Sequence, residues 1–191
     1  MTDIRDILSL ERLDADIYRG TAVESVLPRT FGGQVAAQAL VAATRTVEKK
    51  DVHSLHGYFV RPGRASEPTI FLVDRIRDGR SFATRKVSAV QNGETIFEMQ
   101  ASFHRNDDVG PEHSDLMRTV PAPEEIGRDD RTLPDTSRAL LEEWKDWDIR
   151  IVPSDQYEHN KYGADAGTGD RLGFLFRPLE SGPGSVVSPR T

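Results

Sequence analysis

The sequence predicts a mixed α+β domain in which an antiparallel sheet wraps around one central helix. Three observations support this class: an alanine-rich segment at residues 34–47, strand-like segments on both sides of it, and two turn dipeptides, Asp78-Gly79 and Asn92-Gly93. Both dipeptides favour two-residue hairpin turns, because the two central residues of a type I′ turn take a positive φ. Residues 69–105 are therefore expected to form a three-stranded antiparallel meander.

The first 23 residues are expected to hold a short helix and then one strand. Thr2 or Asp3 can cap a helix that runs through Leu10, because a short polar side chain accepts hydrogen bonds from the first free N–H groups of a helix. Residues 10–23 read LERLDADIYRGTAV, in which apolar and polar residues alternate as far as Gly20. This period of two indicates a single strand.

Residues 34–47 are expected to form a buried helix. This segment has no proline or glycine, and five of its fourteen residues are alanine. Alanine has the highest helix propensity, and apolar groups cover most of the circumference. Both an ordinary core helix and a helix wrapped by a curved sheet fit this composition.

Strands are expected on the C-terminal side of this helix, at residues 52–60 and 68–76, before the rest of the meander. In the last strand, successive side chains should point to opposite faces. The apolar side chains expected to share one face are those of Phe97, Met99, Ala101 and Phe103.

The composition excludes several classes of function. The 191 residues carry a formal net charge of −6, which argues against a general nucleic-acid-binding surface. The sequence has no cysteine, which excludes disulfides, thiol catalysis and cysteine-based zinc sites. His53 and His56 should point to opposite faces of a strand, so no metal pair is expected there. No signal-peptide pattern and no apolar run of ~18 residues occurs, so we expect a cytoplasmic protein without a membrane partner.

The character of the chain changes after Arg105. Residues 106–148 are rich in Asp, Glu and Pro, which indicates a linker, with a short helix expected at 137–147. Residues 149–162 begin with one more strand. Residues 163–191 hold six of the chain's 15 glycines and are expected to form a tail without regular structure.

Four segments together resemble the N-terminal half of the acyl-CoA thioesterase II family, over about residues 5–162. They are RTFGGQVAAQAL, VHSLHGYFVRPG, RDGRSFATRKVSAVQNGETIFEMQASFHR and DIRIVPSDQYEHNKY. The resemblance implies a double hotdog fold, with one complete hotdog at residues 1–105. It also implies a truncated or altered start of the second hotdog at residues 149–162, with the rest missing.

The resemblance implies hydrolysis of fatty acyl-CoA to a free fatty acid and CoA, without a cofactor or metal. It also implies a homo-oligomer that forms through pairing of hotdog sheets. The family positions its hydrolytic water with an Asp, a Ser or Thr, and a Gln of the second hotdog, none of which can be carried over to this chain. The sequence therefore leaves open whether this chain alone is active.

Three residues are candidate catalytic groups. His53 is a candidate base, because imidazole titrates near neutral pH, although a histidine in a strand is more often structural. Gln34 on the helix and Gln100 in the last strand are the pseudo-symmetric counterparts of family positions. Gln34 could equally be a first-turn residue that is satisfied by a neighbour.

Other residues are candidates for substrate binding. Gly32 and Gly33 precede the helix, whose free N–H groups could meet charge on a thioester oxygen, although two glycines can also simply form a tight turn. Arginines around the first hairpin could bind CoA phosphates, although exposed arginines on hairpins are common. These hairpin candidates, with the residues that could line the pantetheine path, are Arg77, Gly79, Arg80, Ser81 and Phe82.

Two further functions remain open from the sequence. The chain could be a non-catalytic hotdog half that binds acyl-CoA or dimerises, because an isolated hotdog leaves a sheet edge uncovered. It could also be a hotdog dehydratase or hydratase that acts on acyl thioesters. That chemistry uses an acid on the central helix, and residues 34–47 contain no Asp or Glu, so it ranks last.

Overall fold

The computed structural model separates the chain into two units, Met1–Pro111 and Glu112–Thr191, which are described separately below. The division falls a few residues after the expected end of the first domain. The residues that the structure describes are 4–23, 25, 29–107, 110–111, 113, 121–127, 138, 142, 147–152 and 173–178.

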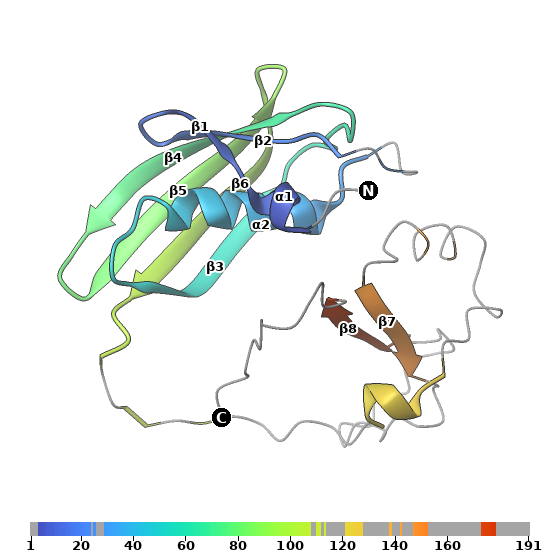
Figure 1. Cartoon of the computed structure of the whole chain (residues 1–191). Coiled ribbons are helices and arrows are strands. Elements are labelled where there is room, and N and C mark those ends of the chain that lie inside the picture. Colours follow the sequence, from blue (N-terminus) through green and yellow to red (C-terminus); the bar gives the residue numbers. More distant parts are fainter. Residues whose placement is uncertain are drawn as a thin grey trace, which may run out of the picture. The chain divides into compact units, whose positions relative to one another are not determined.

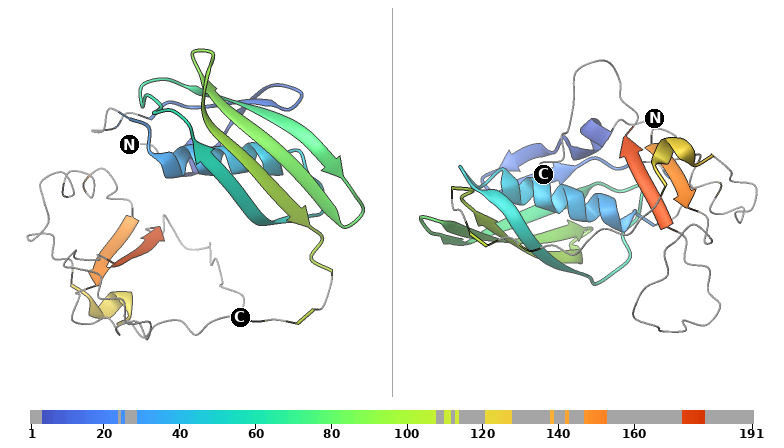
Figure 2. Two further views of the ribbon diagram at one scale, coloured as in Figure 1. Left: turned by 180° about the vertical axis from the view of Figure 1, so that it is seen from behind. Right: turned by 90° about the horizontal axis from the view of Figure 1, so that it is seen from below.

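The first unit is a six-stranded antiparallel sheet with a helix across one face (Figure 1). Its strands follow the order β1-β2-β4-β5-β6-β3. Figure 2 shows from two further sides that the sheet curves around this helix, α2. The α+β class expected from the sequence is therefore confirmed. The elements of this unit are α1 (Ile4–Leu8), β1 (Glu11–Asp14), β2 (Ile17–Gly20), α2 (Gly32–Thr44), β3 (Asp51–Phe59), β4 (Thr69–Asp78), β5 (Phe82–Gln91) and β6 (Glu94–His104).

Helix α2 is buried along the face that it turns toward the sheet. The buried side chains recur at helical spacing and are mostly alanine, which lets the sheet approach the helix backbone closely. The helix begins at Gly32, two residues earlier than expected, so both glycines lie in its first turn. The buried residues of α2 are Val35, Gln38, Ala39, Ala42 and Ala43.

The expected meander is confirmed, with β4 paired to β5 and β5 paired to β6. The expected face of β6 is also confirmed, because all four of its apolar side chains are buried. At the second turn, Asn92 and Gly93 take φ values of 50° and 79°, as a type I′ turn requires. The first turn was wrongly predicted: Gly79 does not take a positive φ, and its N–H donates to the carbonyl oxygen of Phe82 at 2.8 Å, closing a longer loop.

The single strand expected at residues 10–23 is wrong, because the structure has a hairpin of β1 and β2 there. Asp16 turns the chain with a φ of 58°, a conformation that aspartate adopts more readily than most residues. Arg75 of β4 holds this turn, since its Nε and Nη2 donate to the two carboxylate oxygens of Asp16 at 2.9 and 2.8 Å. These bonds lower the pKa of Asp16 below its usual range.

The second unit contains a two-stranded antiparallel sheet of β7 (Trp147–Val152) and β8 (Gly173–Pro178), and a short 3₁₀ helix, η1 (Pro123–Glu125). Strand β7 lies where the sequence predicts one. Strand β8 differs from the expectation, because it lies inside residues 163–191, where no regular structure was expected. Most of the helix expected at residues 137–147 falls outside the described residues.

No helix among the described residues is long and apolar enough to cross a membrane. The same part of the chain shows no group of three or more histidine or acidic side chains that could hold a metal ion.

Candidate active site

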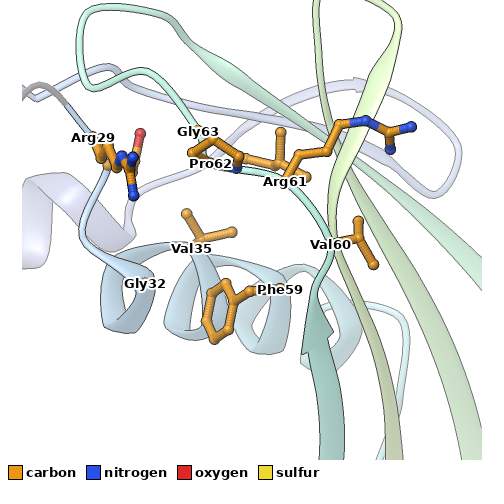
Figure 3. A pocket seen from close by; sticks show the side chains of 10 residues that line it. Arg29, Gly32, Val35, Phe59, Val60, Arg61, Pro62 and Gly63 are labelled. Atoms are coloured by element: carbon orange, nitrogen blue, oxygen red, sulfur yellow. The ribbon is translucent and has the colours of Figure 1, made fainter.

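A cavity of about 320 Å³ opens beside the N-terminus of α2 in the first unit. Figure 3 shows Val35 and Phe59 facing this cavity, while Arg61 points away from it. Most of its lining is apolar, and Arg29 and Arg61 are the charged residues that line it. The apolar lining side chains come from α2, from the end of β3 and the loop after it, and from β6: Val35, Phe59, Val60, Pro62 and Ile96.

The loop that forms one wall of the cavity is tied down at several points. Val60 donates its N–H to the carbonyl of Ile96 at 2.9 Å, and Thr30 donates its N–H to the carbonyl of Gly63 at 3.0 Å. The buried side chain of Gln91 braces the far end of the loop: its amide oxygen accepts from the N–H of Arg64 at 2.9 Å. Its amide nitrogen donates to the carbonyl of Arg64 at 3.1 Å. The wall is therefore fixed by backbone hydrogen bonds.

The polar groups at the cavity are hydrogen-bond donors. The N–H groups of Gln34 and Val35 are bonded to the carbonyl of Phe31. Those of Gly32 and Gly33 lie in the first turn, where helix geometry supplies no intrahelical partner, and the helix macrodipole is positive there. The hydroxyl oxygen of Thr30 is buried and has no hydrogen-bond partner among the described residues.

Both glycines at the start of α2 lie close to aromatic rings. A Cβ on Gly33 would lie 2.5 Å from Cε1 of Phe31, and one on Gly32 would lie 3.0 Å from Cζ of Phe59. Both distances are shorter than ordinary van der Waals contacts. Two exposed aromatic rings therefore stand over the helix N-terminus, and glycine leaves room for them.

The candidate catalytic residues do not come together. Gln34 lies in the first turn of α2, on the helix side of the sheet. Gln100 alternates with the buried Met99 and Ala101 in β6, so its side chain faces the opposite side. The sheet thus separates Gln34 from Gln100, and one substrate molecule cannot contact both within this unit.

His53 also lies on the side of the sheet that faces away from α2. Its Nε2 is 2.8 Å from the hydroxyl oxygen of Ser102, and its ring packs against that of Phe82. A β-bulge between Val52 and Ser54 makes His53 an extra residue in β3. The expectation that His53 and His56 point to opposite faces is therefore wrong, because His56 pairs with the outward-facing Gln100.

The candidate CoA-binding group lies at the other end of α2 from the cavity. Its members belong to the β4–β5 hairpin, which the Arg85 guanidinium ties to Thr46, just after the end of α2, at 2.7 Å. Since α2 has 13 residues, its two ends are about 20 Å apart. The hairpin residues Arg77, Gly79, Arg80, Ser81 and Phe82 therefore do not form one compact site with Gly32 and Gly33.

Several cavity residues were missed in the sequence. Arg29 and Thr30 immediately precede the Phe-Gly-Gly run, and Phe59, Val60 and Pro62 surround the Pro-Gly turn after β3. Both runs are visible in the sequence as glycine-containing turns next to aromatic residues. What the sequence does not show is that the hydrogen bond between Thr30 and Gly63 brings the two turns together.

Comparisons with known proteins all relate the first unit to acyl-CoA thioesterases. Residues 24–104 match the family model described as "Acyl-CoA thioesterase N-terminal domain". Human acyl-coenzyme A thioesterase 8 is 47% identical over 124 residues, which are 64% of this chain and 39% of that protein. Acyl-CoA thioesterase 2 of Haemophilus influenzae is 36% identical over 143 residues, 74% of this chain and 50% of that protein. The chain thus spans half or less of these relatives.

Two solved structures extend the comparison. An acyl-CoA thioesterase II, TesB2, from Mycobacterium marinum is 44% identical, with a TM-score of 0.74 that covers 96% of this chain and 63% of that one. A protein with a hot dog fold from Alicyclobacillus acidocaldarius is 22% identical, with a TM-score of 0.65 over 80% of this chain and 56% of that one, and it supports the fold alone. Residues 24–104 therefore match the acyl-CoA thioesterase N-terminal domain model, and the sheet around α2 has the hotdog fold.

Proposed function

We propose that the protein hydrolyses fatty acyl-CoA to a free fatty acid and CoA, with this chain supplying the N-terminal domain of the enzyme. The observation that carries this proposal is the match of residues 24–104 to the acyl-CoA thioesterase N-terminal domain. Water is the nucleophile: its oxygen bonds to the thioester carbonyl carbon, the carbon–sulfur bond breaks, and the CoA sulfur ends as a thiol. No cofactor is needed for these steps.

The N-terminus of α2 is the proposed place for the thioester carbonyl. Negative charge develops on the carbonyl oxygen as water attacks, and donors aimed at that oxygen stabilise the transition state. The N–H groups of Gly32 and Gly33 are suited to this role, and the Thr30 hydroxyl is a third donor without a partner among the described residues. Gln34, in the same helical turn, is the proposed group that holds the attacking water.

The general base is expected to come from outside this unit. No lining residue of the described cavity is an aspartate, a glutamate or a histidine. Hydrolysis still requires a group that takes a proton from water. We propose that this base is a carboxylate of a second hotdog, and the assay below tests this by adding one.

The test is release of free CoA from a fatty acyl-CoA, followed with a thiol reagent. The 191-residue chain is assayed beside a version that is extended by a second hotdog from a relative. We expect turnover by the extended protein and none by the shorter chain. An extended protein that folds, as judged by circular dichroism, and still releases no CoA would remove the proposal.

A second candidate function is a non-catalytic hotdog that dimerises through its sheet. Strand β3 lies at one end of the strand order, so one of its edges is unpaired in the described sheet. Leu55 and Phe59 on this strand are 49% and 60% exposed, which an edge strand of an isolated protein usually avoids. We propose a homo-oligomer through β3. Sedimentation should give a dimer, and a stable monomer at all concentrations would count against it.

We propose that the protein is cytoplasmic and has neither a nucleic-acid partner nor a membrane partner. A formal net charge of −6 supports the absence of a nucleic-acid partner, which a filter-binding assay would check. The cytoplasmic location and the absence of a membrane partner are tested by fractionation of cells that express the full protein.

A further inference from the structure

Gln91, the last residue of β5, is a buried polar residue whose side chain is bonded to residues 64–69. It is 6% exposed, and its amide oxygen accepts from the N–H of Arg64 at 2.9 Å. Its amide nitrogen donates to the carbonyls of Arg64 and Glu67 at 3.1 and 3.0 Å. The same nitrogen donates to the hydroxyl of Thr69 at 3.1 Å. A side-chain amide suits this place because it both accepts and donates, whereas a carboxylate only accepts.

The loop that Gln91 holds reaches the segment that leads into α2. The carbonyl of Gly63 accepts from the N–H of Thr30 at 3.0 Å, and Arg29 and Arg64 form an antiparallel bridge. In Figure 3, Gly63 lies beside Arg29, above the first turn of α2. A Cβ on Gly63 would lie 3.2 Å from both Oε1 of Gln91 and Oγ1 of Thr30. The two side chains therefore approach the same residue, one from β5 and one from the start of the helix.

A single peptide group carries this connection. The carbonyl of Gly63 and the N–H of Arg64 belong to the same peptide unit, which is planar, so fixing one end fixes the direction of the other. Gln91 holds the N–H end, and the N–H of Thr30 is bonded to the carbonyl end. Without Gln91 the peptide plane is free to turn, and a turn would take the carbonyl away from Thr30.

The Thr30 bond fixes the backbone just before the donors at the helix N-terminus. Thr30 is followed by Phe31, whose carbonyl accepts from the N–H of Gln34 at 3.1 Å and closes the first turn. Gly32 and Gly33 lie within this turn. Donors to an oxyanion act only when they are held in the right geometry, and a misplacement of about 1 Å can cost on the order of a hundredfold in rate.

We propose that Gln91 is a positioning residue for thioester hydrolysis. It orients the peptide group between Gly63 and Arg64, which holds Thr30 and, through it, the N–H groups of the first turn of α2. The inference rests on the proposed function, because it takes a thioester oxyanion to be the group that these donors meet. Gln91 acts through the backbone and not on the substrate, since it is buried and does not line the cavity.

Amide hydrogen exchange, followed by nuclear magnetic resonance on the 191-residue chain, tests the connection. Gln91→Met keeps the length of the side chain and removes its hydrogen bonds. The N–H groups of Thr30 and Gln34 should then lose protection by about fivefold relative to the amides of the sheet. Arg85→Met is the matched control, because it removes buried hydrogen bonds at the other end of α2 and should leave these two groups as protected as before. Loss of protection that is confined to Arg64 and its loop would overturn the inference.

The kinetics of the protein extended by a second hotdog test the consequence for the reaction. Gln91→Met should lower kcat about tenfold and leave KM within about twofold, because donors to an oxyanion act mainly in the transition state. Arg85→Met should leave kcat unchanged. Gln91→Glu keeps the acceptor for the N–H of Arg64, so it should lose only about threefold in kcat, and it replaces Gln91→Met if that variant does not fold.

The outcomes separate this inference from the proposed function. Unchanged kcat of the Gln91 variants, in an extended protein that releases CoA, would overturn the inference and leave the proposed hydrolysis standing. An equal loss of kcat in Arg85→Met would also overturn it, because the effect would then follow stability alone. If the unsubstituted extended protein releases no CoA, the proposed function is removed. The exchange comparison still decides in that case whether Gln91 holds the N-terminus of α2.

Discussion

Arg85 is expected to be a main source of stability in the hotdog. Its side chain is 1% exposed, and its guanidinium donates five hydrogen bonds at the C-terminal end of α2. The acceptors are the Thr46 hydroxyl at 2.7 Å, the Thr46 carbonyl at 2.9 Å, the Asp78 carboxylate at 2.6 Å, and the carbonyls of Arg77 and Thr84, each at 3.0 Å.

The loss in free energy of unfolding when Arg85 is replaced depends on which of its hydrogen-bond acceptors are buried. Arg85→Met keeps a similar shape but leaves the Thr46 carbonyl buried without its donor, which costs about 1–3 kcal/mol. The carbonyls of Arg77 and Thr84 are partly buried, so water replaces part of what they lose. Asp78 has a side chain that is 56% exposed, so its ion pair adds less than about 1 kcal/mol. We expect a total loss of about 2–4 kcal/mol.

Urea unfolding followed by far-ultraviolet circular dichroism measures this loss. Two matched variants separate its sources: Asp78→Asn removes only the exposed ion pair, and Arg80→Met removes an exposed arginine from the same hairpin. Both should change the free energy of unfolding by less than about 1 kcal/mol. If Arg85→Met lowers the free energy of unfolding no more than Asp78→Asn does, the buried Thr46 carbonyl has found another donor, and the stabilising role of Arg85 is refuted.

Three further changes have defined outcomes. Asp16→Asn should destabilise the protein at pH 7. Because the pKa of Asp16 is lower in the folded state than in the unfolded state, its stabilising contribution is present above about pH 4 and is lost as the pH falls further. The difference in urea midpoint between the two proteins should therefore vanish at low pH. Gly57→Ala should cost about 1–3 kcal/mol in the same assay, because its Cβ would lie 2.6 Å from the buried Phe97 ring. Thr30→Val should leave stability unchanged or slightly raised while weakening acyl-CoA binding in calorimetry about tenfold, because the hydroxyl has no partner in the described fold; unchanged binding would exclude it from the site.

The central elements of the fold were predictable because their signals are local. The alanine content of residues 34–47 and the alternation of β6 each depend on a few neighbouring residues, and Asn92-Gly93 is a strong turn signal by itself. The hairpin of β1 and β2 was missed for the same reason. The alternation of apolar and polar residues continues through Ala15 and Asp16, and no glycine there marks a turn. The two hydrogen bonds from Arg75 that hold this turn come from a distant strand, so the local sequence does not show them.

The candidate site was harder to predict because it depends on which residues from distant strands share a face. The bulge at His53 places His53 and His56 on the same side of the sheet, and only the pairing of β3 with β6 shows this. Arg85 follows the hairpin closely in the sequence, yet it is buried and bonded to Thr46, which no local pattern shows. Gly32 and Gly33 were expected to precede the helix, whereas the structure places both in its first turn.

Phe59 connects the proposed assembly to the proposed binding site. It is the last residue of the edge strand β3, it is 60% exposed, and its side chain lines the cavity. A partner that pairs with β3 would therefore cover this ring and close the cavity beside it. Closure would remove water from the acyl chain and from the donors at Gly32 and Gly33, which strengthens their hold on a developing oxyanion. We therefore expect the N-terminal domain to supply part of the substrate site, and pairing along β3 to complete that site before hydrolysis begins.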